Sequence, residues 1–134
     1  MKKHWIQYTQ DRRPGPMTYW VHIETNRQGA DGAREHDPPL PGLIAGRGYA
    51  TYLVEFDSAE LRFASLDELR VCIRTLSEKH LPSNLRMTNK RGAGYGPSNH
   101  WLNRIPLRSM AWPYRCKVTR YLKAALADFE RRQA

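Results

Sequence analysis

The sequence predicts an α+β domain, in which a small antiparallel sheet of three or four strands packs against two main helices and a short one. Segments in the N-terminal half alternate apolar and polar residues, as half-buried strands do, whereas segments in the C-terminal half have helical spacing. With 134 residues, 40% of them hydrophobic, the chain has the length of one ordinary domain. Such a length can bury a core without disulfides or metals. We therefore expect residues 1–134 to form a single domain.

Strands are expected in the N-terminal half, over residues 4–9, 18–25, 49–57 and 61–63. The link between the first two segments is short and rich in Pro and Gly, which favours an antiparallel hairpin. Four apolar residues would then share one sheet face, which is either covered by another layer or forms a binding or homodimer surface. These residues are Trp5, Trp20, Tyr49 and Leu53.

Residues 26–47 separate the second and third predicted strands. This segment is rich in Gly, Pro and mixed charge, with Pro38, Pro39 and Pro41 at its centre. Connections of this length are uncommon in compact domains unless they are functional or disordered. We expect a flexible loop without regular structure.

Helices are expected in the C-terminal half. Ser65 and Glu68 fit a capping box, and the apolar residues that follow recur at helical spacing, so a helix is predicted from 66 to about 79, before Pro82. Residues 98–105 are predicted to form a short helix that ends at Pro106. A last helix begins near Pro113 and runs to about 132. The apolar positions are Leu66, Leu69, Ile73 and Leu76 in the first helix and Tyr114, Val118, Tyr121, Leu122, Ala125 and Phe129 in the last.

Charge is unevenly distributed along the chain. The net charge is +9, but residues 1–67 sum to −1 and residues 68–134 to +10. Residues 79–127 contain ten Lys or Arg and no Asp or Glu. An acid-free block of this length indicates a surface for a polyanion such as DNA or RNA, or for an acidic protein.

A loop at residues 89–101 is the centre of this block. Gly92, Gly94 and Gly96 allow close approach of a ligand to the backbone, and Ser98 can cap the short helix that follows. This arrangement predicts a phosphate cradle. Further candidate phosphate contacts are Lys90, Arg91, His100, Arg104, Arg108, Arg115, Lys117, Arg120 and Lys123, and candidate stacking residues are Tyr95, Trp101 and Trp112.

Other classes of function have weaker signals. The glycine spacing fits no nucleotide-binding motif, the five histidines lack metal-ligand spacing, and we expect no metal and no cofactor. Cys72 and Cys116 are expected to be reduced thiols. No apolar run is long enough to span a membrane and no secretory leader is evident, which predicts a cytoplasmic protein.

The sequence thus favours a small, basic, non-enzymatic protein that binds nucleic-acid phosphates. One alternative is an adaptor domain that docks on an acidic protein, as a homodimer through the aromatic sheet face. A less favoured alternative is a small phosphodiesterase or nuclease that uses His100, the one weak catalytic candidate, for which the sequence names no partner group.

Overall fold

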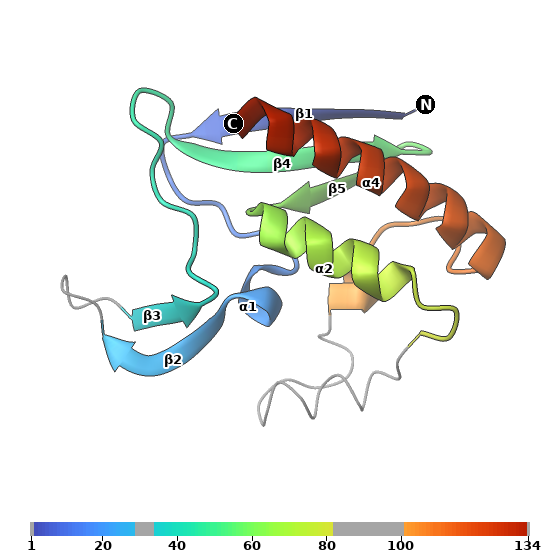
Figure 1. The fold of residues 1–134 in the computed structure, drawn as a ribbon, viewed down its shortest axis with the longest axis horizontal. Helices are drawn as coiled ribbons and strands as arrows, with labels where there is room; N and C mark the ends of the chain where they lie inside the picture. The colour runs from blue at the N-terminus through green and yellow to red at the C-terminus, as the bar shows by residue number, and fades with distance from the viewer. Residues whose placement is uncertain (1, 29–33, 82–100, 134) are drawn as a thin grey trace.

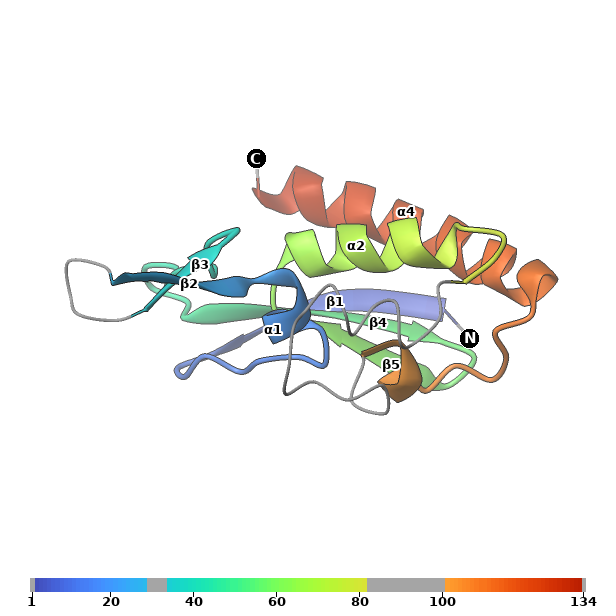
Figure 2. The same ribbon diagram turned by 90° about the horizontal axis from the view of Figure 1, so that it is seen from below.

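The computed structural model of the chain describes residues 2–28, 34–81 and 101–133, and its main elements form two layers (Figure 1). One layer is an antiparallel sheet with the strand order β1 (Lys2–Thr9), β4 (Tyr49–Phe56), β5 (Ala59–Phe63). The other layer consists of α2 (Leu66–Leu76) and α4 (Trp112–Gln133), which lie side by side on one face of the sheet (Figure 2). The predicted α+β class is confirmed.

The central strand of the sheet is β4, which pairs with β1 on one side and β5 on the other. Leu53 therefore stands between Trp5 and Arg62 in the register. A two-residue turn joins β4 to β5, and both of its residues, Asp57 and Ser58, have positive φ angles of 51° and 67°. Such angles are typical of a type I′ hairpin turn, whose twist matches that of the strands.

The prediction of a strand over residues 18–25 is wrong for residues 18–22, and only residues 23–25 are in a strand. Thr18–Val21 forms a short helix, α1, and the chain then enters β2 (Ile23–Gln28), which pairs with β3 (Arg34–Asp37) in a separate two-stranded sheet. The predicted hairpin of this segment with β1 is wrong as well. The alternating pattern was misleading, because the buried residues Thr18, Val21 and His22 follow the i, i+3, i+4 spacing of one helical face.

Two further regions differ from expectation. Within residues 26–47, where no regular structure was predicted, β2 runs to Gln28 and β3 occupies Arg34–Asp37, while residues 29–33 lie outside the described part. The short helix predicted at 98–105 is a single 3₁₀ turn, η2 (Trp101–Arg104), in the described part of that segment.

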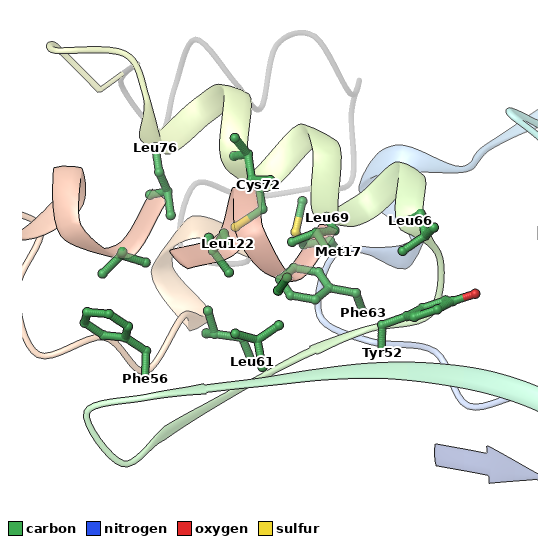
Figure 3. Packing of buried hydrophobic residues seen from close by; sticks show 14 of the residues in the cluster. Met17, Tyr52, Phe56, Leu61, Phe63, Leu66, Leu69, Cys72, Leu76 and Leu122 are labelled. Carbon is green, nitrogen blue, oxygen red and sulfur yellow. The ribbon is translucent and has the colours of Figure 1, made fainter. Parts of the chain in front are cut away.

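The hydrophobic core lies between the two helices and the sheet (Figure 3). Leu66, Leu69, Ile73 and Leu76 of α2 are all buried, as their spacing predicted. They belong to the same cluster as the sheet residues Tyr52, Val54, Phe56, Leu61 and Phe63 and the α4 residues Val118, Leu122, Ala125 and Phe129. The predicted packing of the first long helix against the sheet is confirmed.

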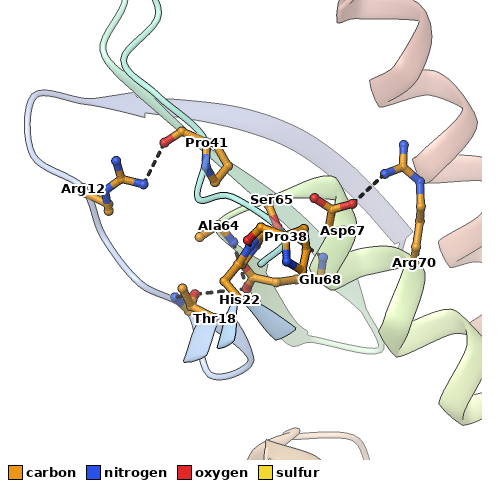
Figure 4. A network of polar contacts seen from close by, with 11 residues as sticks. Arg12, Thr18, His22, Pro38, Pro41, Ala64, Ser65, Asp67, Glu68 and Arg70 are labelled. Carbon is orange, nitrogen blue, oxygen red and sulfur yellow. Dashed lines mark hydrogen bonds and ion pairs between the residues drawn. The ribbon is translucent and has the colours of Figure 1, made fainter. Parts of the chain in front are cut away.

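A buried polar network fixes α1 against the start of α2 (Figure 4). Ser65 Oγ accepts the backbone N–H of Glu68 at 3.2 Å, which is the predicted N-terminal cap. The Glu68 carboxylate is itself fully buried, and its Oε1 accepts the hydroxyl of Thr18 at 3.1 Å and the N–H of Ala64 at 3.2 Å. A carboxylate at this depth is tolerated because several donors satisfy it.

Candidate nucleic-acid interface

Three cations stand in a row on the outer side of α4. Lys117, Arg120 and Lys123 are exposed, whereas Val118 and Leu122 on the opposite side are fully buried. At about 1.5 Å of rise per residue, the row spans about 9 Å along the helix. Within the described part of the chain, none of the three takes part in an ion pair.

The neighbouring helix α2 adds Arg74, which is exposed and in no ion pair among the described residues. The partly or fully exposed acidic side chains on these two helices are neutralised by neighbouring arginines. The ion pairs are Asp67 and Glu130 with Arg70, at 3.2 Å each, and Asp128 with Arg131 and Arg132, at 3.0 Å each. The uncompensated positive charge of the helical layer therefore lies at Arg74 and over the middle of α4.

A further cation reaches the flank of α4 from β1. The Lys2 ammonium lies 5.8 Å from the ring centre of Phe56 and 5.9 Å from that of Tyr121. Tyr121 follows Lys117 by one helical turn, so Lys2 extends the basic surface from α4 to the start of β1.

An aromatic side chain marks the start of the same helix. Trp112, the first residue of α4, is 36% exposed, and the Arg115 guanidinium lies 5.0 Å from its ring centre. Arg115 is fixed in turn, since its guanidinium donates to the carbonyls of Leu76, Met110 and Lys79 at 3.1, 2.8 and 2.7 Å and also to that of Glu78. The indole is thus supported on one side by an immobile planar cation.

The same geometry corrects the prediction for Arg115. This residue is 3% exposed, and its donors are occupied by carbonyls at the end of α2 and before α4, so it is not available to a phosphate. The signal was present in the sequence, because Arg115 precedes Val118 and Leu122 by three and seven residues and so lies on the apolar stripe.

The prediction of Trp101 as a stacking residue is corrected as well. It is 3% exposed and belongs to the hydrophobic core, so it offers no stacking surface. The predicted sheet face of Trp5, Trp20, Tyr49 and Leu53 does not form as expected. Trp20 belongs to α1, and Leu53 is only 3% exposed. Trp5 and Tyr49 are half-buried.

The remaining candidates fall into two groups. Arg104 and Arg108 are exposed but are not part of the row on α4: Arg104 lines a cavity beside β5, and Arg108 lies 3.8 Å from Asp57 in the β4–β5 turn and 4.7 Å from the ring centre of Tyr114. The second group lies outside the described residues. It comprises Lys90, Arg91, Gly92, Gly94, Tyr95, Gly96, Ser98 and His100, the predicted phosphate cradle with its weak catalytic candidate.

Two other properties bear on function. In the ranges 2–28, 34–81 and 101–133, no cluster of three or more His, Cys, Asp or Glu side chains is arranged to hold a metal ion. Among the described helices, none combines the length and the apolar character needed to cross a membrane. Comparison of the chain with known protein families, with curated proteins and with solved structures gives no match.

Proposed function

We propose that this chain is a non-enzymatic nucleic-acid-binding protein whose contacts to backbone phosphates come from the outer face of α4. The observation that carries the proposal is the row of Lys117, Arg120 and Lys123, three exposed cations on successive turns with no acidic partner among the described residues. Arg74 and Lys2 enlarge the row on its two sides.

The distribution of acids supports this assignment. Surface cations that serve only solubility are commonly interspersed with acids, as they are at the C-terminal end of α4. In the middle of the helix they are not. The cations there repel one another, and this repulsion is relieved when a polyanion neutralises them, which favours binding. Release of counterions from the nucleic acid adds a favourable term that depends on salt.

Fluorescence anisotropy with labelled single-stranded and duplex oligonucleotides of unrelated sequence tests the proposal. We expect binding below about 100 μM at near-physiological salt, and affinities that differ little between sequences, because phosphate contacts carry no sequence information. Each phosphate contact contributes about 0.9 to the slope of log affinity against log salt on a duplex, and about 0.7 on a single strand. Replacing both Arg120 and Lys123 with Gln should therefore flatten the duplex slope by roughly 1.5 to 2 units.

The matched control is Arg131→Gln, which removes an exposed arginine of the same helix that is already paired with Asp128. This variant should leave the slope nearly unchanged. If the wild-type protein binds neither oligonucleotide in this range, the nucleic-acid assignment is wrong, and an acidic protein becomes the expected partner of this face.

A further inference from the structure

A cavity of about 240 Å³ lies beside the outer edge of β5. Residues 60–63 of the strand form one wall. The opposite walls are formed by Pro16 and Met17, which precede α1, and by Arg104, Ile105 and Pro106 at the end of η2. In Figure 2, η2 appears beside β5, on the side of the sheet away from α2 and α4. The cavity is therefore separate from the basic row on α4.

The hairpin geometry determines which backbone groups of β5 point into this cavity. In a hairpin with a two-residue turn, the residues that flank the turn, here Phe56 and Ala59, form a hydrogen-bonded pair. Hydrogen-bonded pairs alternate with pairs that are not bonded along an antiparallel ladder. The N–H and C=O groups of Glu60 and Arg62 consequently point away from β4, towards the free edge.

Gly15 provides an independent check. A Cβ atom placed on Gly15 would lie 2.8 Å from the carbonyl oxygen of Arg62, so this carbonyl does project outward, against the segment that precedes α1. The close approach ends the accessible edge at Arg62. The N–H and C=O of Glu60 and the N–H of Arg62 remain, and no hydrogen bond within the described part of the chain uses them.

These three groups present a donor, an acceptor and a second donor in the order in which a β-strand presents them. A peptide backbone in extended conformation has the complementary alternation, whereas a sugar-phosphate chain does not. An exposed strand edge of this kind is the usual template for addition of a strand from another chain.

The side chains around the cavity indicate which residues a strand added to this edge would carry. Leu61, Phe63 and Met17 line the cavity and belong to the hydrophobic core, each at most 4% exposed. The rim carries Arg62 and Arg104 against the single acid Glu60, and none of these three forms an ion pair among the described residues. The excess of positive charge favours a peptide with acidic side chains. We propose that the outer edge of β5 binds an extended acidic peptide of a partner protein as an additional strand of the sheet.

Proline substitution tests the backbone pairing directly. Glu60→Pro removes an outward N–H that the β4 ladder does not use, and proline is tolerated at such edge positions. The matched control is Glu60→Gln, which keeps the N–H and removes the negative charge. Circular dichroism and thermal melting should show that both variants fold.

The probe is a fluorescein-labelled octapeptide that alternates valine with glutamate, compared with one that alternates valine with lysine. We expect the glutamate peptide to bind with Kd below about 1 mM, and Glu60→Pro to weaken it at least tenfold, which corresponds to about 1.4 kcal/mol. Glu60→Gln should retain or strengthen binding, and Arg104→Gln should weaken it. Hydrogen exchange at the Glu60 amide of the wild-type protein should slow when the peptide is added.

A variant of α4 separates this site from the proposed nucleic-acid interface. Replacing Arg120 and Lys123 with Gln should leave the affinity for the glutamate peptide within about twofold, because the two surfaces are separate. The inference is overturned if the glutamate peptide does not bind, if it binds Glu60→Pro as well as the wild type, or if its binding depends on Arg120 and Lys123 instead. None of these outcomes alters the oligonucleotide measurements, so the two proposals fail independently.

Discussion

The imidazole Nε2 of His22 lies 2.7 Å from Ser65 Oγ (Figure 4). His22 follows the last residue of α1, and Ser65 caps the start of α2. His22 is fully buried and its Nδ1–H donates to the carbonyl of Pro38 at 2.7 Å, because a carbonyl can only accept. The single hydroxyl hydrogen of Ser65 points to Glu68 Oε2, 3.1 Å away. Nε2 must then donate to Ser65, which requires an imidazolium beside the buried Glu68 carboxylate.

The stability of the fold should therefore depend on pH above about 6.5, the ordinary pKa of histidine. Burial lowers the pKa of His22, but the Glu68 carboxylate, whose Oε2 lies 3.6 Å from Nε2, and the hydrogen bond to Pro38 outweigh it, so the pKa is raised above its ordinary value of 6.5. A raised pKa in the folded state contributes stability that is complete below about 6.5 and is lost as pH rises through the folded-state pKa. Urea unfolding from pH 6 to 9 should show this decline.

Glu68→Gln serves as the control for this titration. The neutral amide no longer favours the imidazolium, so the variant should be less stable than the wild type near pH 6 and should show a flatter pH dependence. Equal pH dependence of the two proteins would contradict the assignment of a charged His22.

Arg115 is predicted to be a structural residue. Its guanidinium satisfies carbonyls at the C-terminal end of α2, and removal of one member of a buried polar cluster leaves the others unpaired. Arg115→Met should reduce the free energy of unfolding by roughly 3 to 5 kcal/mol, and Arg115→Lys should recover only part of it, because an ammonium lacks the planar fork. Neither change should alter the salt slope of oligonucleotide binding by a folded variant. A slope reduced by about one unit would show a phosphate contact instead.

The packing of α2 gives a prediction about the core. Leu69 is fully buried between the helices and the sheet, so Leu69→Ala should cost about 2 to 5 kcal/mol, measured by denaturant unfolding. The exposed Arg74 on the same helix is the control, and Arg74→Ala should change stability by less than about 0.5 kcal/mol. A loss for Leu69→Ala as small as that of the control would place the leucine outside the core.

The elements that were predicted correctly are those in which local pattern and tertiary burial agree. α2 has a cap at Ser65, a helical stripe and a core-facing side, and β4 places Tyr52, Val54 and Phe56 in the core at every second position. The strand prediction failed at residues 18–22 because the alternation of Tyr19, Val21 and Ile23 does not correspond to burial, since Tyr19 and Ile23 are 44% and 41% exposed. Burial of Thr18 against Glu68 depends on a contact fifty residues away, which no local pattern contains.

The candidate site was predictable in part for the same reason. The helical spacing of Lys117, Arg120 and Lys123 places them on one exposed side of α4 without knowledge of the rest of the fold. The ion pair of Arg70 with Glu130 joins elements that are distant in sequence, and the edge groups of Glu60 follow from the pairing of β5 with β4. A count of basic residues along the chain contains neither relationship.

The exposed indole of Trp112 should distinguish single strands from duplexes. Trp112 lies at the start of the helix that carries the basic row, and Arg115 holds one side of its ring, so a base can stack on it with little loss of side-chain freedom. Stacking of one base on an aromatic side chain contributes roughly 1 to 3 kcal/mol on single strands. Trp112→Ala should therefore weaken binding of single-stranded oligonucleotides by about 5-fold to 150-fold. Bases in a duplex are already stacked on one another, so duplex binding should change little.

Tyr19→Ala, which removes an exposed aromatic residue from α1, should leave both affinities unchanged. If Trp112→Ala alters single-strand and duplex binding to the same extent, the indole does not stack on bases and the protein reads only the phosphate backbone.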